Sequence, residues 1–138
     1  MLKTAELFDR DRVPEALRGL LDVEFPWEVL ALLDRFGEAL QDQRQAGNVH
    51  PSAVVEGPLF MEDGAEVGPY AYLTGPVYLA AGAKVGHTAY LRGPVVLGPG
   101  AHAMHATEVK RSLLLGSAKA PHFNYVGDSV VGHDVNLG

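Results

Sequence analysis

Two pairs of side chains that could bind an anion or a metal ion recur at a spacing of 18 residues. Arg92 and Lys110 form one pair, and His87 and His105 form the other. An arginine fork beside a lysine ammonium could together hold a dianion such as a phosphate. Imidazole suits zinc or nickel, and His102 could supply a third ligand, but no cysteine or carboxylate completes that set. Both possibilities require a fold that brings residues 18 apart in the chain side by side.

The segment that carries these pairs follows a period of six residues. Every sixth residue from Val49 is large and aliphatic except Ala103: Val55, Met61, Val67, Leu73, Leu79, Val85, Leu91, Leu97, Val109 and Leu115. Small or aliphatic residues stand four places after these positions, with Thr107 as the only polar member. A helix would repeat every 3.6 residues and a strand every 2.0. A period of six therefore predicts a solenoid of short strands and turns.

Glycine and proline follow a longer period, of 18 residues. Gly-Pro pairs stand at 57–58, 75–76 and 93–94, and further glycines stand at 64, 82 and 100. Eighteen is three times six, so each coil should have three sides, and equivalent residues should stack about 4.8 Å apart. We expect coils at roughly 55–72, 73–90 and 91–108, with a fourth coil beginning at 109. Arg92 and Lys110 would then lie in neighbouring coils.

The six-residue period breaks after Leu115. The next position in phase would be Pro121, which cannot donate a hydrogen bond to a neighbouring strand. The phase resumes at Tyr125, which predicts that this side chain points inward, and residues 119–124 fall in an irregular coil. Irregular turns of repeat proteins are where function concentrates, so His122 becomes a candidate functional residue.

The first 47 residues follow a helical pattern instead. Pro14 and Pro26 stand where the first turns of two helices would begin. The second helix would carry an apolar stripe of Val29, Leu32, Leu33, Phe36 and Leu40, widened by Trp27 and Leu30. We therefore expect a helical, linker-like segment at 1–47 and a solenoid domain at 48–138, with the stripe packed against the solenoid or a neighbouring copy.

Composition and charge exclude several classes of protein. The chain has no cysteine, which removes disulfide frameworks, thiolate metal sites and cysteine nucleophiles. Its net charge of −6 disfavours nucleic acid as a partner. No apolar run approaches the roughly 18 residues that span a bilayer, and the first residues lack the apolar core of a secretion signal. These features predict a cytoplasmic protein that binds neither nucleic acid nor membrane.

The sequence resembles the hexapeptide-repeat acyltransferases. The repeats Val85–Tyr90 and Leu97–His102 have the pattern of that family. The segment Glu108–Asp128, with its Glu-Val-Lys and Lys-Ala-Pro-His-Phe-Asn-Tyr-Val-Gly-Asp motifs, is similar to the acetyltransferase domain of bifunctional UDP-N-acetylglucosamine pyrophosphorylase/glucosamine-1-phosphate N-acetyltransferases. It is closer still to the C-terminal domains of related sugar-1-phosphate nucleotidyltransferases, whose domain linker resembles Phe25–Glu28. The resemblance implies a mainly β fold, a left-handed parallel β-helix, and a homotrimer.

The resemblance also implies roles for individual residues. His122 matches the general base that takes a proton from the sugar amine, a role that suits imidazole near neutral pH. Arg92 and Lys110 match the cations that hold the sugar phosphate, and Tyr125 and Asn136 match residues that hydrogen-bond the sugar. The acyl donor would be acetyl-CoA, and no metal is expected. The coils that supply much of the acetyl-CoA site in that family would follow Gly138, so no residue is assigned to the coenzyme.

Two other functions are compatible with the sequence. The solenoid could be a non-catalytic trimerisation or regulatory module that acts with a separate nucleotidyltransferase chain, since no nucleotidyltransferase domain and no Gly-rich phosphate loop are present. A carbonic-anhydrase type of β-helix would instead bind a metal ion between subunits through His87, His102 and His105.

Overall fold

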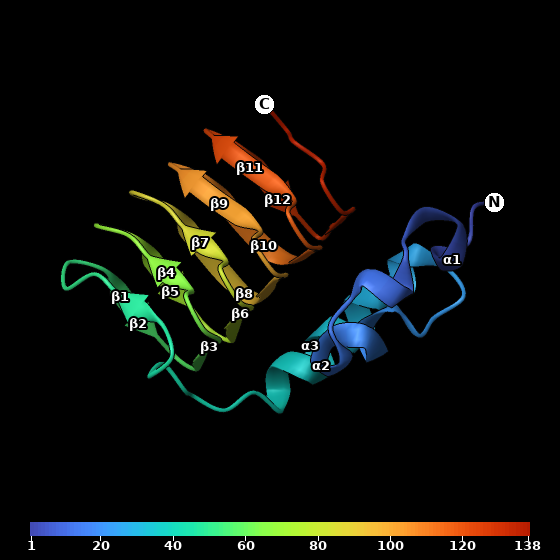
Figure 1. The fold of residues 1–138 in the computed structure, drawn as a ribbon, viewed down its shortest axis with the longest axis horizontal. Helices are drawn as coiled ribbons and strands as arrows, with labels where there is room; N and C mark the ends of the chain where they lie inside the picture. The colour runs from blue at the N-terminus through green and yellow to red at the C-terminus, as the bar shows by residue number, and fades with distance from the viewer.

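The computed structural model describes residues 1–138. Residues from Asn48 onward wind into a three-sided solenoid of parallel strands, and the N-terminal residues form short helices beside it (Figure 1). The helices are α1 (Thr4–Leu7), α2 (Glu15–Arg18) and α3 (Val29–Glu38), with 3-10 turns at Arg10–Arg12, Gly19–Leu21 and Pro26–Glu28. The fold class expected from the sequence, a mainly β left-handed β-helix after a short helical segment, is confirmed.

The strands line three faces of the solenoid. The first face holds β1 (Asn48–Val49), β4 (Glu66–Val67), β7 (Lys84–Val85), β9 (His102–His105) and β11 (Lys119–His122). The second face holds β2 (Val54–Glu56), β5 (Tyr72–Thr74), the first halves of β8 (Tyr90–Leu97) and β10 (Glu108–Leu114), and β12 (Tyr125–Gly127). The third face holds β3 (Leu59–Met61), β6 (Val77–Leu79), the second halves of β8 and β10, and β13 (Val130–Val131).

The period of six places aliphatic side chains inside the solenoid as far as Val109. Leu73 and Leu91 are fully buried, and they are register partners in adjacent coils. The alanines at 65, 83 and 101 are buried as well and belong to the same apolar cluster. Small and large side chains alternate around each coil because a narrow triangular interior holds few atoms per layer. The repeat of 18 is exact over these coils, since Tyr72 pairs with Tyr90 and Tyr90 pairs with Glu108.

The register changes earlier than the sequence pattern predicts. Lys110 pairs with Arg92, 18 residues before it, but Ser112 pairs with Val95, 17 residues before it. Arg111 therefore stands alone where the preceding coil has Gly93 and Pro94. From this point the core positions move by one place, to Leu114, Ala118, Ala120, Val126 and Val131. The expected break after Leu115 is wrong because one residue is missing at Arg111.

The helical segment packs on the third face of the solenoid. Val29 and Leu33 of α3 are fully buried in a second apolar cluster, with Val96 and Leu113 contributed by the solenoid. Leu32, Phe36 and Leu40 pack at its margin. Trp27 departs from the expected stripe: its side chain is 55% exposed and stacks on Phe25, with ring centroids 4.8 Å apart. No helix of the chain is long and apolar enough to span a membrane.

Gly37 lets α3 approach the solenoid closely. A Cβ atom on Gly37 would lie 2.7 Å from Cγ of Pro76 and 2.9 Å from Cβ of Pro94. These prolines belong to the Gly-Pro pairs at the corner between the second and third faces. Asp34 lies about one helical turn before Gly37, and it contacts Arg111, which follows the two prolines along the same corner. The helix therefore runs along this corner and crosses successive coils.

Candidate functional site

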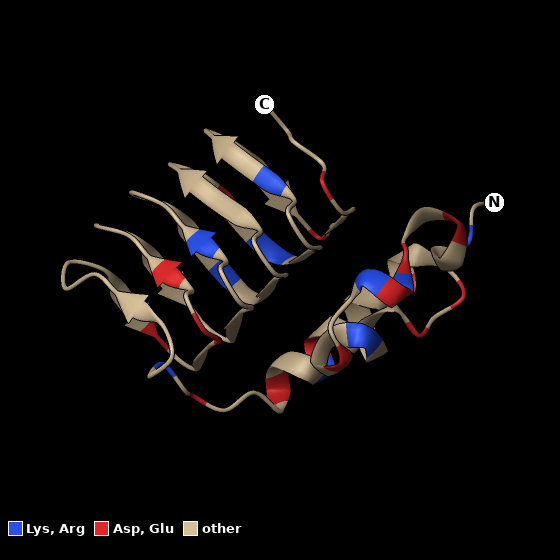
Figure 2. Cartoon of the chain, viewed as in Figure 1, with Lys and Arg blue, Asp and Glu red and all other residues tan.

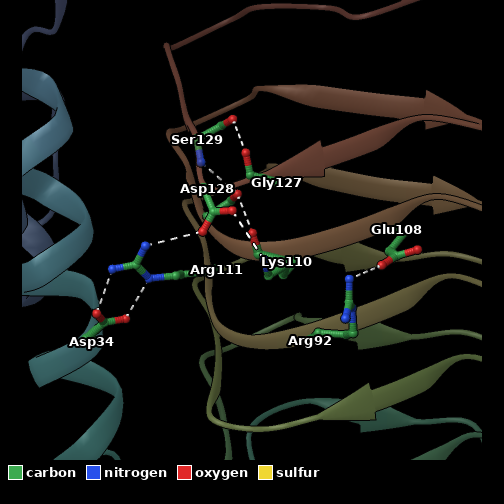
Figure 3. Close-up of polar contacts among 9 residues, drawn as sticks. Asp34, Arg92, Glu108, Lys110, Arg111, Gly127, Asp128 and Ser129 are labelled. Atoms are coloured by element: carbon green, nitrogen blue, oxygen red, sulfur yellow. Dashed lines mark hydrogen bonds and ion pairs between the residues drawn. The ribbon is translucent and has the colours of Figure 1, made fainter.

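Arg92 and Lys110 lie side by side on the second face, as the spacing of 18 predicts. They are register partners on the adjacent strands β8 and β10. Each is already paired with a carboxylate: Arg92 Nη2 lies 2.7 Å from Glu108 Oε2, and Lys110 Nζ lies 3.3 Å from Asp128 Oδ2 (Figure 3). The Arg92 guanidinium also lies 5.6 Å from the centroid of the Tyr90 ring. Two cations and two carboxylates thus form a compact, self-neutralised group of half-exposed side chains.

Tyr125 belongs to the same face, but it points outward. Its side chain is 61% exposed, and Val126 occupies the inward position that the sequence pattern gives to Tyr125. Tyr125 is the register partner of Glu108, so it continues a column that begins with Tyr72 and Tyr90. The inward orientation expected for Tyr125 is wrong because the missing residue at Arg111 moves every later side chain by one place.

The ring of Tyr125 lies over Gly127. A Cβ atom at Gly127 would lie 2.9 Å from Cε2 of the tyrosine ring. Gly127 is in turn the register partner of Lys110. The absence of a side chain at Gly127 therefore allows Tyr125 to fold back toward the row that holds Lys110 and Arg92.

His122 lies at the corner that leads from the first face to the second. It is the last residue of β11, and three residues later Tyr125 begins β12. The side chain of Asn124 holds this corner, because its Oδ1 accepts a hydrogen bond of 3.1 Å from the His122 backbone N–H. The Asn124 backbone N–H donates to the hydroxyl of buried Thr107 at 3.4 Å, and that hydroxyl donates to the Ala120 carbonyl at 3.2 Å. The imidazole itself is exposed.

Asn136 lies apart from this group. It forms an isolated parallel bridge with Lys119, so it continues the first face and not the second. Its side-chain oxygen accepts a hydrogen bond from the backbone N–H of Gly138 at 3.0 Å. The structure thus gathers Arg92, Lys110 and Tyr125 on one face, puts His122 at the neighbouring corner, and leaves Asn136 on another face.

The histidines at 87 and 105 stack as their spacing predicts. Their ring centroids lie 5.5 Å apart with an angle of 24° between the planes. Tyr70 and Phe123 extend this stack at either end by edge-on contacts. His102 lies on the first face between its register partners Lys84 and Lys119. No three histidine, aspartate or glutamate side chains of the chain converge on a point that could hold a metal ion.

Charged residues of opposite sign succeed one another along the coils (Figure 2). On the first face, Glu66 and Lys84 are register partners, and Lys84 Nζ lies 3.8 Å from Glu66 Oε2. Burial, followed by the neighbouring ammonium groups of Lys119 and Lys84, holds the pKa of His102 below its ordinary value. His102 is therefore held in its neutral form to a lower pH than a free imidazole.

Arg111 is the member of the site that the sequence pattern misses. Its Nε and Nη2 donate to Asp34 Oδ1 and Oδ2 of α3 at 3.0 and 2.8 Å, and its Nη1 donates to Asp128 Oδ1 at 3.3 Å. Asp128 thus receives Arg111 on one oxygen and Lys110 on the other. Hydrogen bonds from Arg111, and then from Lys110, lower the pKa of the Asp128 carboxyl. The available signal was the single residue at 111 where earlier coils have Gly-Pro.

The fold has counterparts among solved acetyltransferases. No family model matches this chain, and no curated protein matches it. The structure is similar to serine acetyltransferase isoform 3 from Entamoeba histolytica, solved in complex with cysteine, with a TM-score of 0.55 and 12% sequence identity. That match covers 85% of this chain and 43% of the other, so this chain spans less than half the length of that enzyme.

A second match is the acetyltransferase domain of PglB from Neisseria gonorrhoeae, solved in complex with acetyl coenzyme A. It has a TM-score of 0.35 and 13% identity, and the match covers 78% of this chain and 62% of that one. At the identity of the serine acetyltransferase match, the similarity establishes the β-helix fold that the two chains share.

Proposed function

We propose that this chain is an acyltransferase of the β-helix type that acts on a sugar phosphate. The reaction is the transfer of the acetyl group from acetyl-CoA to the amine of glucosamine-1-phosphate. The observation that carries this assignment is the grouping of Arg92, Lys110 and Tyr125 on one face, with His122 at the adjoining corner. An acidic chain that keeps an arginine and a lysine side by side has a plausible anchor for a phosphate dianion.

The phosphate would replace the carboxylates that now hold the two cations. Arg92 would exchange Glu108 for one phosphate oxygen, and Lys110 would exchange Asp128 for another. The released carboxylates would lie close to the ligand, where they can accept hydrogen bonds from the hydroxyl and amine groups of the sugar. A half-exposed ion pair costs little to open, because such pairs contribute about 0.2–1 kcal/mol.

His122 would act as the general base. Its imidazole takes a proton as the sugar nitrogen attacks the thioester carbon, and the carbon–sulfur bond then breaks. Coenzyme A leaves as the thiol after it gains a proton, and the sugar nitrogen becomes an amide. The rigid corner built by Asn124 and Thr107 would hold the backbone of His122 in place through this cycle.

The active form would be a homotrimer. Three large aromatic side chains are exposed along the corner that follows the first face and at the start of β12: Tyr70 and Phe123 at the corner, and Tyr125 on the second face. Exposed aromatic groups of this kind typify protein interfaces. A neighbouring copy would cover the open side of the His122 corner and exclude water from it, and trimerisation would therefore be required for turnover.

Release of free thiol measures this activity directly. The chain is incubated with acetyl-CoA and glucosamine-1-phosphate, and coenzyme A is detected with a thiol reagent. We expect substrate-dependent release that His122→Ala lowers at least about 100-fold, the usual range for loss of a general base. His50→Ala is the matched control, because His50 is an exposed histidine in the first coil. Equal rates for wild type and His122→Ala would contradict the assignment.

A non-catalytic trimerisation module is the second candidate. It is favoured by the pairing of both candidate cations with carboxylates of the same chain. In that case the chain forms a stable trimer, binds a separate sugar-1-phosphate nucleotidyltransferase and releases no thiol. Light scattering coupled to gel filtration, on the chain alone and mixed with such an enzyme, separates the two functions. Failure of the two proteins to co-elute would count against the module.

A further inference from the structure

We propose, on the basis of the function proposed above, that Asp34 and Arg111 are positioning residues that set how strongly Asp128 holds Lys110 and hence how readily Lys110 takes a ligand phosphate. Four side chains form an unbroken row of alternating charge: Asp34, Arg111, Asp128 and Lys110 (Figure 3). The row begins on helix α3 and ends at the candidate phosphate site. Helix α3 is thereby coupled to ligand binding.

The contacts are strongest at the helix end of the row. Arg111 and Asp34 form a two-pronged pair with distances of 3.0 and 2.8 Å. Arg111 reaches Asp128 through its remaining nitrogen at 3.3 Å, and Lys110 reaches the other oxygen of Asp128 at the same 3.3 Å. Asp34 therefore takes the larger share of the arginine. The hold of Asp128 on Lys110 is what remains after Arg111 has been divided between two carboxylates.

The backbone around this row is fixed independently of the side chains. The Asp128 backbone N–H donates to the Lys110 carbonyl at 3.0 Å. The hydroxyl of fully buried Ser112 donates to the same carbonyl at 2.8 Å, and it accepts from the Ser129 N–H at 3.1 Å. Lys110 and Asp128 thus cannot drift apart along the chain. Changes in the charge of the row must act on the side chains.

Removing either end of the Asp34–Arg111 pair should have opposite effects on the site. Without the Asp34 charge, the guanidinium is free to turn wholly to Asp128, so Lys110 is released and phosphate binds more tightly. Without Arg111, Lys110 is the only cation left for Asp128, so Lys110 is held and phosphate binds more weakly. A pair that served only to attach the helix would weaken the protein in the same direction from either side.

The test uses Asp34→Asn, Arg111→Gln and the double variant, with inorganic phosphate as the probe at about 0.15 M salt, where charges beyond about 8 Å are screened. One readout is the pKa of the Asp128 carboxyl, followed by carbon-detected NMR. The other is phosphate affinity, followed by the amide shifts of Arg92 and Lys110. Asp22→Asn is the matched control, because Asp22 forms a similar pair with Arg10 elsewhere on the surface.

We expect Asp34→Asn to lower the pKa of Asp128 further and to tighten phosphate binding about 2- to 5-fold, the scale of one exposed ion pair. Arg111→Gln should raise that pKa and weaken binding by a similar factor. In the double variant the effect of Asp34→Asn should disappear, because it acts through Arg111. Asp22→Asn should leave both readouts unchanged.

Three outcomes would overturn the coupling: shifts of Asp128 in the same direction for both single variants, no shift in either, or an Asp34→Asn effect that persists without Arg111. Asp34→Asn changes one oxygen to an amide on a half-exposed side chain, so it keeps the test open if Arg111→Gln fails to fold. Absence of phosphate binding in the wild-type chain would overturn the proposed substrate site, and the pKa of Asp128 would still decide the coupling.

Discussion

Arg111 of the solenoid and Asp34 of helix α3 meet through two parallel hydrogen bonds, although 77 residues separate them in the chain. Arg111 occupies the corner where earlier coils carry Gly-Pro, and it has a left-handed backbone conformation with φ of 44°. The loss of one residue there both changes the register and places a long cation beneath the helix. The helical segment, the shifted coils and the candidate phosphate site therefore share this one position.

Close packing of α3 on the solenoid should make Gly37 intolerant of a side chain. Gly37→Ala should lower the free energy of unfolding by about 1–3 kcal/mol, because its Cβ would overlap Pro76 and Pro94. Gly19→Ala is the control, since a Cβ there meets nothing within 4 Å. The control should be neutral or stabilising by up to about 1 kcal/mol. Urea unfolding of the two variants measures the difference, and equal stabilities would show that α3 can lift from the corner at no cost.

The cluster between α3 and the third face should be needed for the stability of the whole chain. Leu33→Ala removes a fully buried side chain and should cost about 2–5 kcal/mol. Leu7→Ala, at a position that is 45% exposed, should cost far less. Because the cluster joins both parts, Trp27 fluorescence and far-ultraviolet dichroism should report one transition. Two separate transitions would mean that the helical segment and the solenoid unfold independently.

Acidification should weaken the fold through His102. Its pKa is lowered by burial and by Lys119 and Lys84, so the unfolded chain takes up this proton at a higher pH than the folded chain does. The stability that depends on neutral His102 is complete above the ordinary pKa of histidine, about 6.5, and is lost as pH falls through the lowered folded value. His102→Gln should reduce the loss of stability between pH 7 and 5.

The measurement is urea unfolding at several pH values. His50→Gln, at an exposed histidine, should leave the slope of stability against pH unchanged. His133 should account for part of the slope that remains, since burial and then Arg12 lower its pKa. A His102→Gln variant with the wild-type pH dependence would show that His102 is protonated equally in the folded and unfolded chains.

Gly127 should control ligand binding without controlling stability. Gly127→Ala would push the exposed ring of Tyr125 away, because the new Cβ would lie 2.9 Å from that ring. An exposed ring can move at little cost, so the free energy of unfolding should change by less than about 0.5 kcal/mol. The KM for glucosamine-1-phosphate should rise several-fold, as it should for Tyr125→Phe if the hydroxyl binds the sugar. An unchanged KM in both variants would remove Tyr125 from the substrate site.

Much of the solenoid could be predicted from single residues and their spacing. Leu73 and Leu91 lie in the core, and Arg92 lies beside Lys110, because a coil of fixed length brings each residue next to the one a full turn away. The helix that begins near Pro26 was equally accessible, since its apolar face is visible in the spacing. These features are local or strictly periodic, so no knowledge of the distant chain is needed.

The orientation of Tyr125 was not accessible in the same way. The sequence pattern allows the register to change anywhere between Val109 and Tyr125, and only strand pairing shows that the residue is lost at Arg111. A shift of one place turns an inward side chain outward, so the small error in position reversed the prediction for Tyr125. His122 kept its place at a corner because that corner is fixed by Asn124 and Thr107.

The sequence by itself determined the coil length, the three faces and the row that holds Arg92 and Lys110, because these follow from a repeat that every coil obeys. The tertiary structure decided what departs from the repeat: the partners of Arg111, the outward turn of Tyr125 and the docking of α3 on the third face. Those contacts join residues far apart in the chain. Their energies depend on which surfaces meet, and no local pattern records that.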